Sequence, residues 1–336
     1  MDYVQFGRSG LYVSRQAFGT WKMQKTPKDE FEPLLNEILD AGINVIDMAA
    51  GYGEGRAEIA IGKAIKDRGE RERVILATKS SGPHPREPNG FKTTRRCIME
   101  NCERSLKNLG VDYIDLYQLH CVERFVPIDE TLAAMTDLVK AGKIRYAGCS
   151  NYKGWQLVEA CWAAEKHSYT KFVSDQSEYH LFDRLLEREN FPAMESYGIA
   201  ALIYSPLAQG LLAGKFYGGP DAVPDTEKYK RYKENPDHIF WSEKIQTALG
   251  KLIEMGKKYN KTPAQLALAF VMKHPVTAIP IIAPSNSEQL ADCLGACDIV
   301  VDDEMNAMFD DINRPGDKLH GQKLNLYNHG PTCRWY

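Results

Sequence analysis

The sequence lacks the features that mark membrane, secreted and nucleic-acid-binding proteins. No apolar stretch approaches the roughly 20 residues of a transmembrane helix. The N-terminus, MDYVQFGRSG, has no basic start followed by an apolar segment, so we expect no secretory signal. The formal net charge is -3, which favours neither nucleic acid nor an anionic membrane as a partner. We therefore expect a cytoplasmic protein and leave open whether it forms a homo-oligomer.

The cysteines form no pattern that is typical of a metal site. No C-x-x-C and no paired cysteine–histidine spacing is present, so we expect no bound metal. Several cysteines fall inside apolar patterns, as reduced cysteines of cytosolic proteins do. Cys121 and Cys149 lie beside the polar residues described below, which leaves open that they are sensitive to oxidation. The 8 cysteines are Cys97, Cys102, Cys121, Cys149, Cys161, Cys293, Cys297 and Cys333.

Short apolar runs alternate with amphipathic segments along most of the chain. Because strand after strand is followed by a helix, we predict an α/β fold, a closed parallel (β/α)8 TIM barrel. The expected strands are Ala17–Gly19, Asn44–Met48, Val74–Thr78, Ile114–Leu119, Arg145–Cys149, Phe172–Asp175, Ala201–Tyr204 and Ala278–Ile282. The expected helices are Glu30–Ala41, Ala57–Asp67, Thr94–Leu109, Glu130–Ala141, Trp155–His167, Leu185–Tyr197, Lys244–Tyr259, Pro263–Lys273 and Ser287–Cys297.

Three segments outside this alternation complete the expected fold. YVQFGRSGLYVS, near the start, has the alternation and central turn of an N-terminal β-hairpin. Lys215–Trp241 is expected to be a long irregular loop, and such loops are usually functional. Asp317–Tyr336 lacks periodicity and is expected to pack over the outside or the rim of the barrel. No linker or composition shift divides the chain, so we expect one domain over residues 1–336.

Polar residues close or follow three of the apolar runs. Asp47 closes INVID, and Tyr52 follows it within DMAAGYG. Lys79 closes RVILATK, and His120 closes YIDLYQLH. Parallel barrels build their sites at the carboxyl ends of the strands, so we expect the four residues to meet at one rim. Any one of them alone would be explained as a cap, a turn residue or a rim residue, but the set of four indicates an enzyme.

These residue types can move a proton to or from a carbonyl oxygen. A tyrosine phenol has a pKa of about 10 and is a weak acid near neutrality. The ammonium group of Lys79 is expected to lower the pKa of Tyr52, and Asp47 is expected to keep that lysine charged. His120 is expected to orient the carbonyl group and to share the proton path.

The set resembles the catalytic residues of the aldo-keto reductases, whose aspartate, tyrosine, lysine and histidine match these four positions. The resemblance covers nearly the whole chain and is strongest to the bacterial and plant branch with an extended seventh loop. It implies an NAD(P)-dependent oxidoreductase that reduces a small aldehyde, ketone or sugar carbonyl, or runs the reverse reaction. The matching motifs are FGRSGLYVS, FGTW (Phe18–Trp21), CSNY (Cys149–Tyr152), DQSEYH (Asp175–His180) and YSPLAQGLLAGKF (Tyr204–Phe216).

The resemblance also implies where a nicotinamide cofactor binds. Ser150, Asn151 and Gln176 would hold its carboxamide, and Tyr204 would stack on its ring. Without the resemblance, Asn151 is explained as a turn residue and Tyr204 as a core aromatic. The other cofactor-binding candidates are Thr20, Trp21, Ser205, Leu207, Gln209, Lys215, Ala283, Ser285, Gln289 and Asp292, of which Ser205 to Lys215 match the segment that crosses the pyrophosphate.

The adenosine end departs from the family's pattern. After the last strand the resemblance implies a glycine or lysine and then a basic residue that grips the 2′-phosphate of NADP. This chain has Ala283, Pro284 and Ser285 there, and a dianionic phosphate without a basic partner is poorly held. The family favours NADP(H) and the missing charge favours NAD(H), so the sequence leaves the preference between NADP(H) and NAD(H) near even.

The substrate pocket is expected at the loops that follow the strands. We interpret the basic stretch Lys228, Lys230, Arg231 and Lys233, interleaved with Tyr229 and Tyr232, as a solvated face. The alternative is a cationic lid over the cofactor phosphates or over an anionic sugar. The residues expected to line the pocket are Trp21, Tyr52, His120, Tyr179 and Trp241, with Glu123, Arg124 and Phe125.

Two other functions stay open. A nicotinamide-sensing regulatory subunit, similar to the ion-channel β-subunits of the superfamily, would bind the cofactor without turnover. His120 argues against that function, because those members tend to carry asparagine there. A sugar isomerase or epimerase would keep its cofactor bound and show no net redox change.

Overall fold

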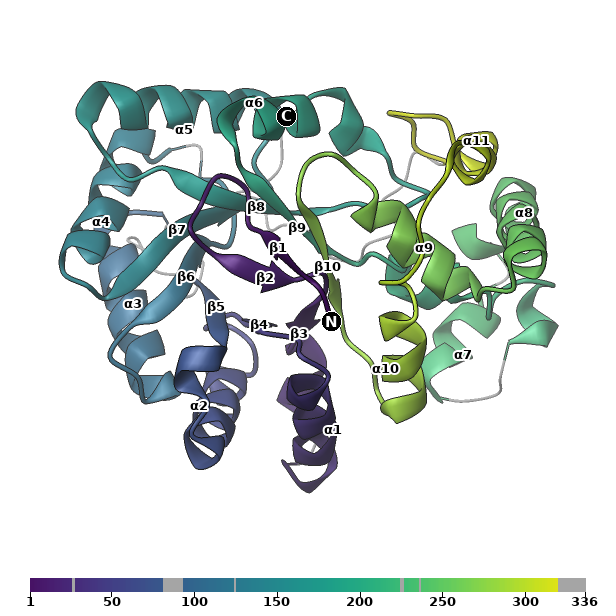
Figure 1. Cartoon of the computed structure of the whole chain (residues 1–336), viewed down its shortest axis with the longest axis horizontal. Helices are drawn as coiled ribbons and strands as arrows, with labels where there is room; N and C mark the ends of the chain where they lie inside the picture. Colours follow the sequence, from purple (N-terminus) through teal and green to yellow (C-terminus); the bar gives the residue numbers. More distant parts are fainter. Residues whose placement is uncertain (26–27, 81–92, 124, 224–226, 236, 320–336) are drawn as a thin grey trace.

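Eight parallel strands form a closed barrel at the centre of the structure (Figure 1). The computed structural model describes residues 1–25, 28–80, 93–123, 125–223, 227–235 and 237–319. The strands neighbour one another in the order β10-β3-β4-β5-β6-β7-β8-β9, and the pairing of β10 with β3 closes the barrel. They are β3 (Ala17–Gly19), β4 (Val45–Asp47), β5 (Ile75–Ser80), β6 (Ile114–Leu119), β7 (Ile144–Ser150), β8 (Phe172–Glu178), β9 (Ala200–Tyr204) and β10 (Ala278–Ile282). The predicted (β/α)8 TIM barrel is confirmed.

Apolar residues of a strand can face either the barrel interior or the surrounding helices, and both positions are buried. Val45 and Leu116 belong to the cluster inside the barrel. Their immediate neighbours Ile46 and Tyr117 belong to the larger cluster under the helices. Successive side chains of a strand point to opposite faces, so this alternation is what the strand geometry requires.

An antiparallel hairpin of β1 (Tyr3–Gln5) and β2 (Tyr12–Ser14) lies across one end of the barrel (Figure 1). Phe6 and Val13 are buried and pack with the first residues of β3, β4 and β5. The hairpin therefore closes the N-terminal end of the barrel. The predicted N-terminal hairpin is confirmed, and the opposite end is left to the residues at the carboxyl ends of the strands.

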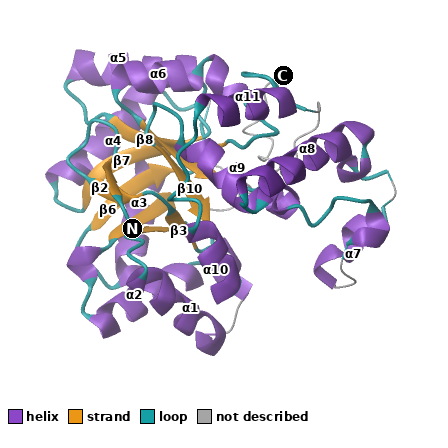
Figure 2. Cartoon of the chain, turned by 45° about the vertical axis from the view of Figure 1, so that its right-hand side comes forward, coloured by secondary structure: helices purple, strands orange, loops and turns teal. Residues whose placement is uncertain are grey.

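Helices surround the strands (Figure 2). No described helix is both long enough and apolar enough to cross a lipid bilayer. Several helices end next to a glycine, as the sequence predicts. Gly110 and Gly198, for example, have φ values of 65° and 69° and adopt the left-handed conformation of a C-cap. The helices are α1 (Lys28–Asp40), α2 (Arg56–Arg68), α3 (Arg95–Leu109), α4 (Ile128–Lys140), α5 (Gly154–His167), α6 (Asn190–Tyr197), α7 (Glu227–Lys233), α8 (Glu243–Tyr259), α9 (Pro263–Met272), α10 (Ser287–Leu294) and α11 (Asp303–Ile312).

The stretch Lys215–Trp241 was predicted to be irregular, and that is wrong for its described part. It contains α7 and two short 3-10 helices. Phe216, Tyr232 and Phe240 are buried, and the rings of Tyr232 and Phe240 stack with centroids 5.1 Å apart. An aromatic cluster therefore supplies the burial that a long loop on its own would lack.

Two helical predictions need correction, and one helix was not predicted. The single helix expected over Leu185–Tyr197 is divided into a 3-10 helix and α6, because Glu189 between them has a non-helical φ of -139°. Helix α11 was not predicted, although Asp302 caps it and Met305 and Phe309 form its buried face. The helix expected over Ser287–Cys297 ends earlier, at Leu294.

The C-terminal segment expected to pack against the barrel lies largely outside the described residues. Within its described part, the backbone N–H of Leu319 donates to the carbonyl of Phe182 at 3.1 Å, and that of Arg184 donates to Asp317 at 2.9 Å. The start of the segment therefore lies against the loop after β8.

Candidate active site

The four predicted catalytic residues, called the tetrad below (Asp47, Tyr52, Lys79 and His120), come from adjacent strands of the barrel. Asp47 is the last residue of β4, Lys79 the last but one of β5, and His120 follows β6 directly. Tyr52 lies in the turn after β4, and its N–H donates to Ala49 at 2.9 Å. Because β4, β5 and β6 pair in parallel, these residues meet at the C-terminal rim.

The ammonium group of Lys79 is fully buried and held by three acceptors. Its Nζ lies 2.8 and 2.7 Å from the two carboxylate oxygens of Asp47, and 2.7 Å from the carbonyl of Met48. Burial lowers the pKa of Lys79 below its usual value, while Asp47 opposes the shift. Only a protonated amine has three N–H groups to donate, so the three acceptors fit the charged form.

Tyr52 lies between Lys79 and two other rings, those of Trp21 and His120. Lys79 Nζ is 5.4 Å from the centroid of its ring. The rings of Trp21 and His120 approach it edge-on, with centroid distances of 5.2 and 6.0 Å. Trp21 is 46% exposed, so the phenol lies beneath a surface that a small molecule can reach.

The net pKa shift of Tyr52 is opposite to the prediction. Burial raises the pKa of Tyr52 far above its usual range, and the negative charge of Asp47 adds to the rise. Lys79 directs its three hydrogen bonds to Asp47 and Met48. The negative charge of Asp47 therefore offsets most of the effect that the ammonium group has on the pKa of Tyr52. Tyr52 therefore keeps its proton at neutral pH, and the shift makes it a weaker acid than a free tyrosine.

The residues expected to hold a carboxamide form one hydrogen-bonded group next to the tetrad. Ser150 Oγ donates to the carbonyl of Gln176 at 2.7 Å, and Asn151 Nδ2 donates to Ser150 Oγ at 2.8 Å. Tyr204 Oη donates to Asn151 Oδ1, also at 2.8 Å. Gln176 Nε2 donates to Asp47 Oδ1 at 2.8 Å, so the group is joined directly to the tetrad.

Two residues expected near a nicotinamide follow β3. Thr20 is buried, and both its N–H and its hydroxyl donate to the carbonyl of Asp47 at 3.0 Å. Trp21 stands beside Tyr52, as described above. Both therefore border the tetrad.

The segment expected to cross a pyrophosphate has an unusual backbone. Ser205, Ala208 and Gln209 have positive φ values of 53°, 47° and 60°, and Gly210 follows at 94°. Non-glycine residues adopt this left-handed region at a cost, and they cluster at ligand-binding segments. Successive N–H groups in such a turn can face an anion. Leu207 is half-buried within this segment, and Lys215 is exposed beyond it.

The residues expected to meet the adenosine half of a cofactor lie beside Lys22, which was not among the predicted site residues. Lys22, in the 3-10 helix Trp21–Lys25, donates from Nζ to the carbonyl of Ala283 and to Ser285 Oγ, the latter at 3.0 Å. Gln289 Oε1 accepts the N–H of Ser285 at 3.0 Å. Of the candidates at this end, Asp292 is turned away, because its carboxylate accepts the hydroxyl of Thr262 at 2.7 Å.

The residues expected to line a substrate pocket are only partly brought together. Trp21 and His120 flank Tyr52, but the prediction for Tyr179 is wrong. Tyr179 is fully buried, stacks on Phe270 at 5.5 Å and donates its hydroxyl to Glu187 at 2.5 Å. Trp241 is held in the aromatic cluster of the long stretch, where its indole N–H contacts the carbonyl of Tyr232 at 3.1 Å. Glu123 is buried, Phe125 is exposed, and Arg124 lies outside the described residues.

Comparison with known proteins places the chain in a family. The profile of the Aldo/keto reductase family matches residues 16–314, which span the barrel and the site. The chain belongs to the aldo/keto reductase family. The family recognised in the sequence is thus confirmed, and with it a general oxidoreductase chemistry on small molecules in which NAD(P)(H) is the usual cofactor.

Relatives of this aldo/keto reductase include both named reductases and channel subunits. YrpG, an uncharacterized oxidoreductase of Bacillus subtilis, is 37% identical over 93% of this chain and 96% of the relative. The aldo-keto reductase YhdN of the same bacterium is 33% identical over 88% of this chain and 89% of the relative. A probable voltage-gated potassium channel subunit beta of Arabidopsis thaliana is 31% identical over 89% of this chain and 92% of the relative.

The cysteines of this family member give no sign of a metal or redox site within the described residues. Seven described cysteines are free, and no group of residues in the described ranges could hold a metal ion. Cys121 and Cys149 are buried, and burial next to Asp175 raises the pKa of the Cys149 thiol well above its usual value. A thiol in that state is a poor nucleophile. The interpretation as reduced structural cysteines is therefore favoured over oxidation-sensitive thiols.

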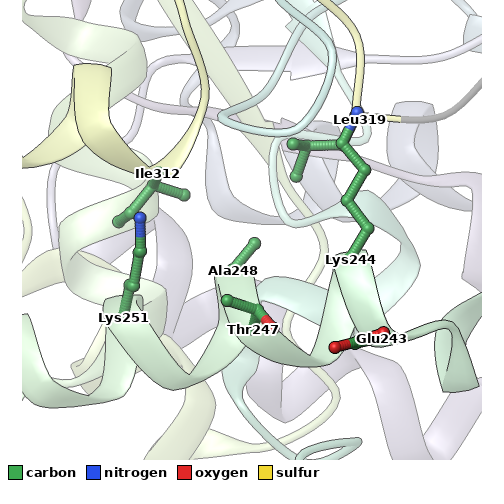
Figure 3. A pocket seen from close by; sticks show the side chains of 7 residues that line it. All are labelled: Glu243, Lys244, Thr247, Ala248, Lys251, Ile312 and Leu319. Carbon is green, nitrogen blue, oxygen red and sulfur yellow. The ribbon is translucent and has the colours of Figure 1, made fainter.

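A surface cavity of about 380 Å³ lies between α8 and the segment after α11 (Figure 3). Lys244 and Lys251 line it from α8, and Ile312 and Leu319 line it from the other side. Lys251 is paired with Asp311 at 2.8 Å. No member of the tetrad or of the carboxamide group lines this cavity, so it is not part of the candidate active site.

Asp175, beside Gln176 on β8, is a buried carboxylate that holds the Asn151 segment in place. It accepts the hydroxyl of Ser177 at 2.6 Å, the N–H of Tyr152 at 3.2 Å and the thiol of Cys149 at 3.4 Å. Burial raises the pKa of Asp175 to about 6, against the lowering effect of these hydrogen bonds. The carboxyl group therefore binds a proton more readily in the folded chain than in the unfolded chain.

We predict that Asp175→Asn makes the chain more stable than the wild type at neutral pH but not at acid pH. The contribution of protonated Asp175 is fully present below about pH 4 and is lost as the pH rises through about 6, at a cost of roughly 3 kcal/mol. Asparagine keeps the shape and cannot ionise. Urea unfolding at pH 4.5 and pH 7.5 should show the difference between variant and wild type growing with pH; a difference that does not change would contradict the prediction.

Proposed function

We propose that this chain is an NAD(P)(H)-dependent reductase of a small aldehyde, ketone or sugar carbonyl, or catalyses the reverse oxidation. The observation that carries the proposal is the hydrogen bond between Gln176 and Asp47 at 2.8 Å. It joins the group suited to a carboxamide to the residues suited to proton transfer. When bound, a nicotinamide would supply or accept the hydride.

The residues of the chain then have distinct tasks in the proposed reaction. Tyr52 gives its proton to the carbonyl oxygen as negative charge develops there. Lys79 and Asp47 form a buried ion pair next to Tyr52. His120, edge-on to Tyr52, orients the carbonyl group. Ser150, Asn151 and Gln176 orient the nicotinamide, and Tyr204 forms one wall of its site.

An absorbance assay of nicotinamide oxidation tests the proposal. Purified protein would be supplied with NADPH or NADH and a panel of aldehydes, ketones and aldoses. Turnover that disappears in Tyr52→Phe supports the reductase. Turnover that survives in Tyr52→Phe would remove this residue from the proton-transfer role. Copurification of stoichiometric cofactor with no net oxidation would point instead to an isomerase or epimerase.

A nicotinamide-binding regulatory subunit is the second candidate. It is favoured by the relatives named as potassium channel subunits, which match this chain at 31% identity. Tight binding of NADPH or NADH, with no turnover of any carbonyl in the panel, would support it. The position of His120 beside Tyr52 favours the reductase instead, because an imidazole next to the phenol can orient a carbonyl.

The same proposal includes a single domain over residues 1–336 and a cytoplasmic location. It leaves the oligomeric state undecided. The folding of the hairpin onto the barrel interior supports the first of these. Size-exclusion chromatography with light scattering would decide whether the chain is a homo-oligomer.

A further inference from the structure

The turn that holds Tyr52 is anchored to β5 at both ends. At its start, the carbonyl of Met48 accepts a hydrogen bond from Lys79 Nζ at 2.7 Å. Just beyond its end, Glu58 in the first turn of α2 accepts the hydroxyl of Thr78 at 2.7 Å. Thr78 and Lys79 are neighbours on β5, and successive side chains of a strand point to opposite faces. Tyr52 therefore lies between two contacts that successive residues of one strand make.

Glu58 is a buried carboxylate whose two oxygens have partners on different elements. Its side chain is fully buried. Oε1 accepts the hydroxyl of Thr78 on β5, and Oε2 accepts the side-chain N–H of Asn108 on α3 at 2.9 Å. Burying a carboxylate costs free energy unless its oxygens are hydrogen-bonded, and here both are. Glu58 thus ties the start of α2 to the strand and to the next helix.

The backbone just before α2 has a conformation that needs support from its surroundings. Gly53, Glu54 and Gly55 have positive φ values of 59°, 58° and 89°. Glu54 is not a glycine, and such a residue keeps a left-handed backbone only where the surrounding structure enforces it. A Cβ atom at Gly55 would lie 2.5 Å from Asn108 Nδ2, so the turn packs directly against the amide that Glu58 binds. We therefore expect the turn to relax when the contacts of Glu58 are lost.

We propose that Glu58 is a positioning residue, which fixes the turn so that Tyr52 stays in the place that proton transfer requires. This inference rests on the proposed function. The hydrogen bonds of Glu58 are made to Thr78 and Asn108, so it acts through the turn and not on the reacting atoms. The ring of Tyr52 lies 5.4 Å from Lys79 Nζ, and a displacement of about 1 Å in a reacting group can lower a rate about 10²-fold. A relaxed turn would therefore slow the chemical step and leave the carboxamide group in place.

The test compares Glu58→Ala with Glu58→Gln. Glu58→Ala removes both hydrogen bonds and is expected to lower kcat about 10- to 100-fold. The affinity for NADPH or NADH should change less than about twofold, because neither hydrogen bond involves the carboxamide group. Glu58→Gln should keep most of kcat, since its amide can accept from Thr78 and donate to Asn108 once the Asn108 amide turns over. Rates are expressed per cofactor-binding site, so that unfolded protein does not count.

Asp115→Ala is the matched control, because it removes a carboxylate that ties β5 to β6 at the opposite end of the barrel. Asp115 is the second residue of β6; it accepts the N–H of Leu76 at 2.9 Å and pairs with Arg71 at 2.8 Å. Its loss should lower the temperature of thermal unfolding, as the loss of Glu58 does, but leave kcat per site unchanged. If kcat per site in Glu58→Ala equals that of the wild type, the positioning role is wrong.

Amide hydrogen exchange of the turn tests the inference without any carbonyl turnover. Exchange at residues 49–57 should be faster in Glu58→Ala than in the wild type, and close to the wild type in Glu58→Gln. Faster exchange there, combined with a wild type that reduces no carbonyl, would remove the reductase function and keep Glu58 as the anchor of the turn. Unchanged exchange in the turn would overturn the inference even where carbonyls are reduced. If Glu58→Ala does not fold, Thr78→Val takes its place; it removes one of the two hydrogen bonds, keeps the shape of the side chain and should change kcat and exchange in the same directions.

Discussion

Tyr52→Phe is expected to lower kcat for carbonyl reduction by about 10²- to 10⁴-fold, the range that general acid catalysis contributes. The substitution removes the hydroxyl from the ring that packs edge-on against Trp21 and His120. The ring itself remains, so the packing against Lys79 is kept. The affinity for the cofactor should stay within about twofold, since no contact with the carboxamide group is removed.

The matched control is Tyr197→Phe, which removes an exposed hydroxyl at the end of α6. It should leave both kcat and cofactor affinity unchanged. The measurement is single-turnover oxidation of NADPH or NADH, which separates the chemical step from product release. If Tyr52→Phe instead weakened cofactor binding and left kcat unchanged, the proton-donor role would be wrong.

Asp47→Asn is expected to reduce the free energy of unfolding by about 3–5 kcal/mol, because it leaves the ammonium group of Lys79 buried without its carboxylate. Lys79 is fully buried, and the carboxylate of Asp47 supplies two of its three acceptors. Part of the loss should be recovered at alkaline pH. The unfolded chain then binds a proton that the buried lysine has released, and stability rises with pH wherever that holds.

A double-mutant cycle makes this prediction specific to the ion pair. Asp47→Asn combined with Lys79→Met removes both charges and should cost less stability than Asp47→Asn alone. Urea unfolding of the four proteins gives the coupling between the two residues. A double variant as unstable as the sum of the two single variants would show that the buried pair is not the reason for the loss.

The barrel and the tetrad could be predicted because both follow from local order along the chain. A polar residue at the end of an apolar run marks the carboxyl end of a buried strand, and parallel strands bring such ends to one rim. Asp47, Lys79 and His120 lie there for that reason. The link from Gln176 to Asp47 follows from the same rule, since β8 ends at the same rim.

Features that depend on barrel closure or on burial could not be read from the sequence. Lys22 and Ser285 lie at opposite ends of the barrel sequence, and only the pairing of β3 with β10 brings them together. The raised pKa of Tyr52 depends on how deeply the phenol is packed and on where Lys79 directs its hydrogen bonds. Tyr179 follows β8 like a pocket residue, but its ring packs inward against Phe270.

Strand β3 is short, so few backbone pairs join it to its neighbours β10 and β4. A bound molecule that contacts both sides of β3 would strengthen this part of the barrel. This strand pairs with β10 through Ala17 and Phe18 and with β4 through Phe18 and Gly19. The residues that follow it anchor one side to Asp47 through Thr20 and the other to Ser285 through Lys22. A dinucleotide lying along this rim would therefore contact both the first and the last strand of the barrel and stabilise their pairing. Amide hydrogen exchange in β3 and β10 should then slow more on binding than exchange in β6 and β7.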